Sequence, residues 1–162
     1  MKDFRDMSLQ CVDAVEISLI IEKEGLAFYE KAAKNVLDSR VKDMFLRLAE
    51  EERKHIQTLQ TKVQFLQPAI SGKGKTLRGV DSFVVEQIKG KIFPTFELKA
   101  LNKFKNDAEA LDYGIELEQR SIETLARLME NEKKLDVKAV FAHLMVEEKK
   151  HLALLEDLKE EI

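Results

Sequence analysis

The sequence predicts an all-α protein, a four-helix bundle made of two helical hairpins joined by a long crossover. Three observations predict this fold. Proline occurs twice and glycine six times in 162 residues, whereas the helix-favouring residues Ala, Leu, Glu and Lys are abundant. Apolar residues recur at helical spacing along four long segments. One half of the chain also repeats in the other. We expect residues 1–162 to form a single domain, because this length suits one core.

The four predicted helices are similar in length. They cover about residues 8–35, 39–66, 106–131 and 136–160, with Asn35, Ser39, Asn131 and Asp136 suited to end or cap them. Each holds about 25 residues and is therefore roughly 38 Å long at 1.5 Å per residue. Short turns join the first helix to the second and the third to the fourth. The hairpins are therefore expected at about 8–66 and 106–160.

The connection between the hairpins, about residues 67–105, contains both prolines and four of the glycines. Within it, the stretch "VDSFVVEQI" predicts a short helix at 80–88. So long a connection joins helices that do not run as antiparallel neighbours, as in bundles with one crossover.

A shift of 96 residues aligns the two hairpins without a gap. Between residues 41–59 and 137–155, nine of nineteen positions are identical. Glu52 and His55 reappear in this alignment as Glu148 and His151. The first and third helices match far less, but Glu22 reappears as Glu118. The fold is therefore expected to contain two copies of one hairpin.

Composition argues against several classes of function. The net charge is only −3, from 27 basic and 30 acidic residues that are interspersed, so no strong field attracts nucleic acid or an anionic membrane. No stretch approaches the roughly 20 apolar residues of a membrane helix, and "MKDFRDMSLQ" lacks an apolar signal core. The single cysteine excludes a disulfide within the chain and a Cys-rich metal site. We expect a cytoplasmic protein.

Four glutamates occupy positions where a core would place apolar side chains. In a helix, residues three, four and seven apart share a face. By this test Glu22, Glu52, Glu118 and Glu148 all lie on apolar stripes. For Glu52 the neighbours on the stripe are Phe45, Leu48, Ala49, His55, Ile56 and Leu59.

Four ionised carboxylates inside one bundle would each lose several kcal/mol of hydration and would repel one another. No lysine or arginine on these stripes offsets the charge. Two divalent cations would balance four carboxylates, and two neutral imidazoles would complete the coordination. Alternatively, "EEERK" and "VEEKK" are solvated surface, which a single E-x-x-H pair would favour. Two pairs in repeat register, with a core-facing glutamate on each other helix, favour the metal site.

With these residues the chain resembles the ferritin-like di-iron carboxylate superfamily, and within it the stand-alone rubrerythrin-like proteins that lack a rubredoxin domain. That superfamily takes one glutamate from each of two helices and Glu-x-x-His from each of the other two. The resemblance assigns these roles to Glu22, Glu118, Glu52 with His55, and Glu148 with His151. The segments "IEKEGLAFYEKAA" at 21–33 and "IFP" at 92–94 also resemble the family's first helix and crossover.

The resemblance implies a ferritin-like bundle that holds two iron ions, with manganese or zinc as possible substitutes. It implies that Glu52 and Glu148 bridge the ions, while the other four residues bind them terminally. Tyr29, two turns beyond Glu22, resembles a tyrosine beside the family's ligands. The matching position in the other half is Leu125, so we expect a slightly asymmetric site.

The function implied is that of an oxidoreductase that reduces hydrogen peroxide or dioxygen in oxidative-stress defence. Because the chain has no Cys-rich iron domain, electrons are expected from an external donor such as a rubredoxin-type protein. A homodimer is expected, with neither nucleic acid nor membrane as a partner. Two alternatives stay open, a ferroxidase that handles iron and a metal-stabilised scaffold without turnover.

The other candidates have ordinary interpretations. His143 lies about 100° from Leu144 on its helix, which favours an exposed histidine over a ligand. Cys11 is expected to be a small, buried or frayed residue, because nothing nearby in the sequence would lower its pKa. Glu51 and Glu147 lie about 100° from their neighbouring ligands, so they are expected at the surface or next to the ligands.

Overall fold

All regular structure in the described part of the chain is helical. The structure is a computed structural model that describes residues 9–71 and 104–162. It contains α1 (Cys11–Ala33), α2 (Ser39–Ser71), α4 (Asp107–Glu130) and α5 (Leu135–Glu161). The all-α prediction is confirmed, and seven of the eight predicted helix ends lie within three residues of the observed ones.

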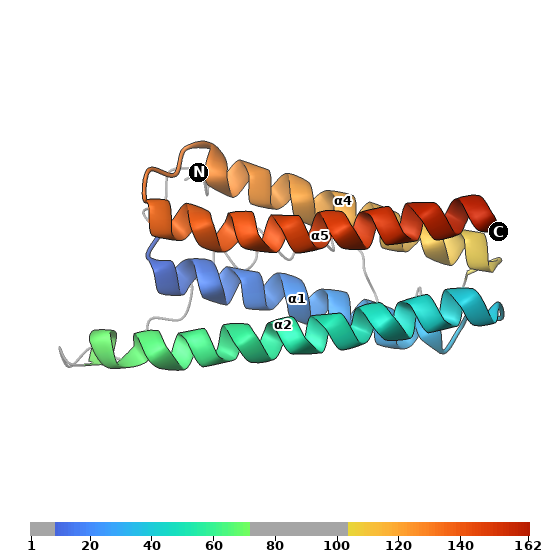
Figure 1. Cartoon of the computed structure of the whole chain (residues 1–162), viewed down its shortest axis with the longest axis horizontal. Coiled ribbons are helices and arrows are strands. Elements are labelled where there is room, and N and C mark those ends of the chain that lie inside the picture. The colour runs from blue at the N-terminus through green and yellow to red at the C-terminus, as the bar shows by residue number, and fades with distance from the viewer. Residues whose placement is uncertain (1–8, 72–103) are drawn as a thin grey trace.

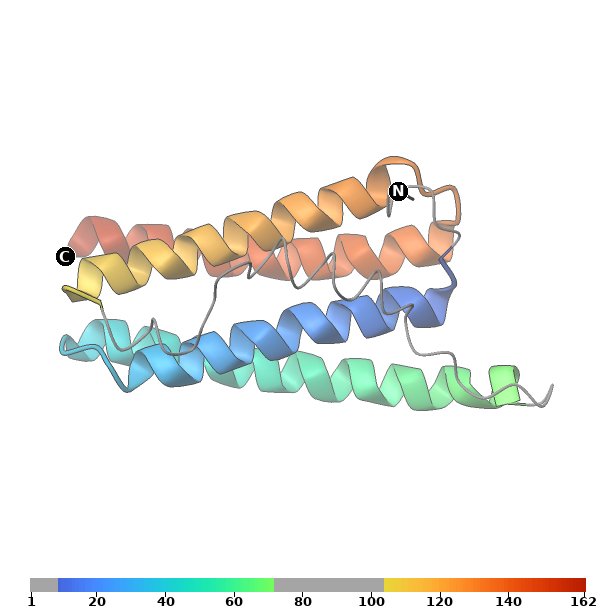
Figure 2. The same cartoon turned by 180° about the vertical axis from the view of Figure 1, so that it is seen from behind.

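The four helices form a bundle of two hairpins. α1 and α2 run antiparallel through the short connection 34–38, and α4 and α5 do so through 131–134. The hairpin of α4 and α5 lies over the hairpin of α1 and α2, as both views show (Figures 1 and 2). α1 packs on α5 as well as on α2, whereas α2 and α5 share few contacts. The backbones of α2 and α5 therefore approach each other less closely than those of the helices within each hairpin.

Polar contacts tie the two hairpins together at both ends of the bundle. At one end the Asp107 carboxylate, at the start of α4, accepts hydrogen bonds from the backbone N–H groups of Leu37 and Asp38 in the first turn. At the other end the Lys134 ammonium donates to the carbonyl of Leu9, 2.7 Å away. These bonds fix how far one hairpin slides along the other, which sets the register of any site that uses all four helices.

Two apolar clusters fill the bundle on either side of its middle. The first includes Phe28 and Phe45, and the second includes Ile17 and Phe141, all of them fully buried. On α1, α4 and α5 the predicted ligands lie between the clusters, since the residues before and after them in the sequence belong to opposite clusters, and on α2 the residues before Glu52 belong to the first cluster. The apolar faces that the sequence predicts therefore form a core that is interrupted once, at mid-length, by polar side chains.

Helix α2 differs from the prediction because it continues to Ser71, five residues into the expected crossover. Proline lacks an N–H and its ring crowds the carbonyl four residues earlier, so the sequence predicts an end before Pro68. The cost is one lost hydrogen bond near the end of a long helix, and the helix continues through it. The predicted short helix at 80–88 and the "IFP" segment lie outside the described residues.

Candidate metal centre

The structure brings the six predicted ligands together at the middle of the bundle. Glu22 comes from α1 and Glu118 from α4, while α2 and α5 each supply a glutamate and a histidine one turn apart. The four glutamates and His151 are at most 2% exposed. Their burial confirms that the acids lie on core faces and excludes the interpretation that "EEERK" and "VEEKK" are wholly solvated. His55 departs from this pattern because its side chain is 24% exposed.

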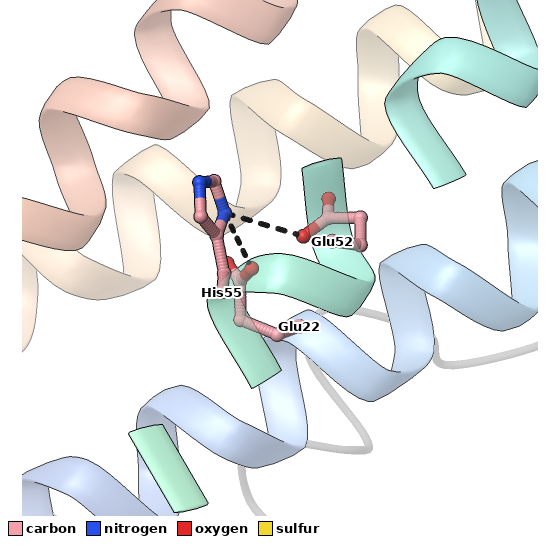
Figure 3. A group of neighbouring side chains, drawn as sticks. All are labelled: Glu22, Glu52 and His55. Atoms are coloured by element: carbon pink, nitrogen blue, oxygen red, sulfur yellow. Dashed lines mark hydrogen bonds and ion pairs between the residues drawn. The ribbon is translucent and has the colours of Figure 1, made fainter. Parts of the chain in front are cut away.

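One half of the cluster consists of Glu22, Glu52 and His55, whose donor atoms lie within 4.8 Å of one another. Nδ1 of His55 is 2.9 Å from Oε2 of Glu22 and 3.9 Å from Oε2 of Glu52. Figure 3 shows the two carboxylates converging on the same ring nitrogen. Two carboxylate oxygens and one imidazole nitrogen so close together form a set of hard donors typical of a divalent metal site.

The other half consists of Glu52, Glu118 and His151, again with donor atoms within 4.8 Å. Nδ1 of His151 lies 3.4 Å from Oε1 of Glu52, 3.6 Å from Oε1 of Glu118 and 3.9 Å from Oε1 of Glu148. Glu52 thus belongs to both halves, with one oxygen toward each histidine. A carboxylate in that position is placed to bridge two ions.

Buried donor atoms in this cluster lack hydrogen-bond partners among the described residues. Each of the four glutamates has one such oxygen, and Nδ1 of His151 has no partner either. No ion pair with lysine or arginine is found for any of the four acids in the described ranges 9–71 and 104–162. Because a buried, unpaired polar atom costs about 1–3 kcal/mol, five of them in one place favour a bound cation or added protons. The donor set therefore fits metal ions.

The outer nitrogens of both histidines face carboxylates of the opposite hairpin. Nε2 of His151 lies 3.1 Å from Oε2 of Glu51, and Nε2 of His55 lies 3.6 Å from Oε2 of Glu147. For His151, a proton on Nε2 held by Glu51 leaves the lone pair of Nδ1 directed into the cluster, as metal-binding histidines require. Of the two positions expected for Glu51 and Glu147, the one beside the ligands is therefore observed.

A comparison with protein-family models agrees with this geometry. The model that matches is that of the rubrerythrins, over residues 13–159. The chain belongs to the rubrerythrin family. No significant match was found among curated proteins or among solved structures. Family membership and the carboxylate and histidine cluster together support a protein of the di-iron carboxylate type, with the ferritin-like fold expected of it.

The electrostatics of this rubrerythrin-family site depend on how its charge is neutralised. Burial is the largest cause that raises the pKa of Glu52 and of Glu148 well above the usual value of 4.5, and neighbouring carboxylates raise both further. For Glu22 burial also raises the pKa, but hydrogen bonding to Glu52 and His55 outweighs it and leaves the pKa lowered. Burial lowers the pKa of His151, but the adjacent Glu118 reverses the shift and the pKa is raised. Without metal, protons therefore take over part of the charge balance.

Tyr29 makes the two halves unequal. Its hydroxyl donates a hydrogen bond to Oε1 of Glu118, and burial, followed by the charge of Glu118, raises the tyrosine pKa well above 10. The repeat-related residue, Leu125, is fully buried in the apolar core and gives Glu22 no such donor. The expected asymmetry is therefore present. Tyr29 stays protonated at neutral pH and keeps its proton on the Glu118 side of the cluster.

The remaining candidates match their ordinary interpretations. His143 is exposed. Cys11 begins α1, half-buried, and burial raises its pKa further, so it is not an activated thiol. The described residues include no helix with the length and apolarity that a membrane span needs.

The sequence interpretation did not single out Gly25, which lies against Glu52. A Cβ atom at this position would be 2.9 Å from Oε1 of Glu52 and 3.3 Å from its Cδ. The signal in the sequence is a glycine within a helix, one turn after Glu22, where helix propensity favours any larger residue.

Replacing Gly25 with alanine should therefore displace the Glu52 carboxylate and weaken metal binding by roughly 10-fold to 100-fold, as changes beside a ligand do. Cobalt titration followed by visible absorption measures the affinity. Gly114→Ala is the matched control, because its Cβ would meet Leu155 and Phe28 at 3.2 and 3.4 Å, among apolar side chains. Equal affinities for the two variants would contradict the proposed position of Glu52.

The metal-free protein should become less stable as the pH rises from about 5 to 8. The raised pKa values of Glu52, Glu148 and His151 mean that the folded protein holds protons which the unfolded chain releases in this range. Their stabilising effect is complete below the ordinary pKa values and is lost as the pH passes the raised ones. The lowered pKa of Glu22 acts only below 4.5, outside this window.

The measurement is the melting temperature in excess chelator at several pH values. Glu52→Gln, which cannot titrate, should flatten the dependence. A wild-type melting temperature that stays constant or rises between the two pH limits would show that the carboxylates are not held protonated in the fold.

Proposed function

We propose that the chain is a di-iron oxidoreductase of the cytoplasm that reduces hydrogen peroxide. The observation that carries the proposal is the set of unpartnered oxygens, one on each of four buried glutamates, beside two histidines. Two divalent ions supply four positive charges, which balance four carboxylates while the imidazoles stay neutral. Oxygen and imidazole donors favour iron or manganese, with zinc as a possible substitute. Membership of the rubrerythrin family supports iron.

The ligand roles follow from the two halves of the cluster. We assign Glu22 and His55 to one ion, and Glu118 and His151 to the other. Glu52 would bridge them, a role that the direction of its two oxygens toward opposite histidines supports. Glu148 would be the second bridge by its resemblance to the family pattern, and its Oε1 lies 3.9 Å from Nδ1 of His151.

Two ferrous ions, when bound, supply the two electrons that split the O–O bond of peroxide, so that one H₂O₂ with two protons gives two waters. The chain's own residues prepare the site for that reaction. Glu51 holds the His151 ring through a hydrogen bond at Nε2, and the Glu147 carboxylate faces Nε2 of His55. Tyr29 holds a proton at its hydroxyl beside Glu118. The apolar clusters on either side limit water in the site.

We propose that a rubredoxin-type donor supplies the reducing electrons. We also propose that the protein acts as a homodimer. The competing functions, iron oxidation for storage and a scaffold without turnover, are separated from peroxide reduction by the measurements below.

The protein purified from iron-supplemented cells should contain two metal ions per chain, held by the six residues named. Plasma mass spectrometry measures the content. Glu52→Ala and His151→Ala should each lose most of it, because they remove a shared or a buried donor. Glu50→Ala, which changes an exposed neighbouring glutamate, is the control. Wild-type occupancy well below one ion, or Glu52→Ala protein with full metal, would refute the assignment.

The reduced protein should be oxidised faster by hydrogen peroxide than by dioxygen. Stopped-flow mixing with each oxidant, followed by ferric absorption, measures both rates, and Glu118→Ala provides a disrupted site. Faster oxidation by dioxygen, with ferric iron collecting in large oligomers seen by native mass, would support iron handling instead. If neither reagent oxidised the reduced protein, peroxide reduction and iron oxidation would both be contradicted, and the scaffold without turnover would be supported.

A further inference from the structure

A small pocket opens between α2 and α5 beside the metal cluster. Its walls include His55, Thr58 and Lys62 from α2, and Val140, His143 and Glu147 from α5. His55 is also a predicted ligand, with Nδ1 toward the carboxylates and Nε2 toward Glu147 at the pocket wall. The pocket therefore reaches the only one of the six predicted ligands that is partly exposed.

The internal repeat shows why the pocket lies on this side. In the other half, the positions equivalent to Thr58 and Lys62 are Leu154 and Leu158. Both leucines belong to, or pack against, the first apolar cluster. The pocket side therefore carries a threonine and a lysine where the other half has two leucines that pack in the apolar core.

The wall of the pocket that α5 supplies also differs from the equivalent residues in the other half. Val140 and His143 correspond to Met44 and Arg47. Met44 packs against the apolar core. Arg47 pairs with Glu51 one turn further along α2, with Nε 3.2 Å from Oε1. The consequence appears at the histidines. His55 is 24% exposed, whereas its repeat partner His151 is fully buried, although the two rings stack with centroids 5.9 Å apart.

We infer that this pocket is the entrance through which hydrogen peroxide and metal ions reach the buried carboxylates, passing beside His55. The inference rests on the proposed function for its oxidant, and on the geometry alone for the metal ions. The pocket volume of about 80 Å³ admits a few water-sized molecules, which suits peroxide and a metal ion. The equivalent position beside His151 is closed, so exchange occurs at the Glu22 and His55 half of the cluster.

The test introduces the leucines of the closed half at the equivalent positions of the pocket. Thr58→Leu combined with Lys62→Leu places the two leucines of the closed side at the entrance. Gln57→Leu combined with Thr61→Leu is the matched control, since these residues are exposed on the same helix and do not line the pocket. Two rates are measured: release of Co(II) from the loaded full-length chain into excess chelator, and uptake of Co(II) by the stripped chain. Circular dichroism establishes that each variant is folded.

The entrance variant should slow release and uptake together by roughly tenfold, which leaves the dissociation constant unchanged because only the barrier rises. Oxidation of the reduced protein by peroxide should slow by a similar factor. Val140→Ala, which widens the entrance, should accelerate metal release and serves as a second test if the leucine pair does not fold.

Unchanged metal rates in both folded entrance variants, or equal slowing in the control pair, would overturn the entrance. Metal rates need no redox chemistry. Slowed metal exchange in a protein that does not react with peroxide would therefore support the entrance while the proposed function fails.

Discussion

Burial of four carboxylates at one level of the bundle is the constraint on which the rest of the structure depends. Each buried ion loses several kcal/mol of hydration, and like charges this close add repulsion. Among the described residues no lysine or arginine forms an ion pair with these carboxylates, and apolar clusters lie on both sides of them. Only protons or metal cations can neutralise the cluster. One oxygen on each acid has no hydrogen-bond partner among the described residues and is available to either.

The site exists only when both hairpins dock. Each hairpin carries its own Glu-x-x-His pair, but the carboxylate that faces the outer nitrogen of each imidazole comes from the other hairpin: Glu51 bonds to His151, and Glu147 faces His55. The bonds from Asp107 and Lys134 at the two ends of the bundle set the register that makes these cross-hairpin contacts possible. A metal that binds the completed cluster therefore stabilises the long-range contacts between hairpins, whose closure is costly in entropy.

The sequence predicted the helices and the six polar core positions because a helix places residues of known spacing on one face, and that depends on local geometry alone. The sequence did not predict the contact between Glu51 and His151. A residue about 100° from the apolar stripe of its own helix has surroundings that depend on the side chains of the neighbouring helix. The exposure of His55 could not be predicted from α2 either. It depends on Val140 and His143 across the interface. The extra turn of α2 beyond Pro68 reflects a local penalty that the helix tolerates.

The internal repeat gives the two halves of the site the same backbone arrangement. Their side chains differ, and each difference makes the His151 half more enclosed than the His55 half. The half that holds His151 is fully buried, is closed by leucines and carries the hydrogen bond from Tyr29 to Glu118. The half that holds His55 has leucine in place of the tyrosine and opens to a pocket. Both differences leave the first half enclosed and the second accessible. If the pocket is the entrance that we propose, a ligand that arrives from solvent meets the Glu22 and His55 half first.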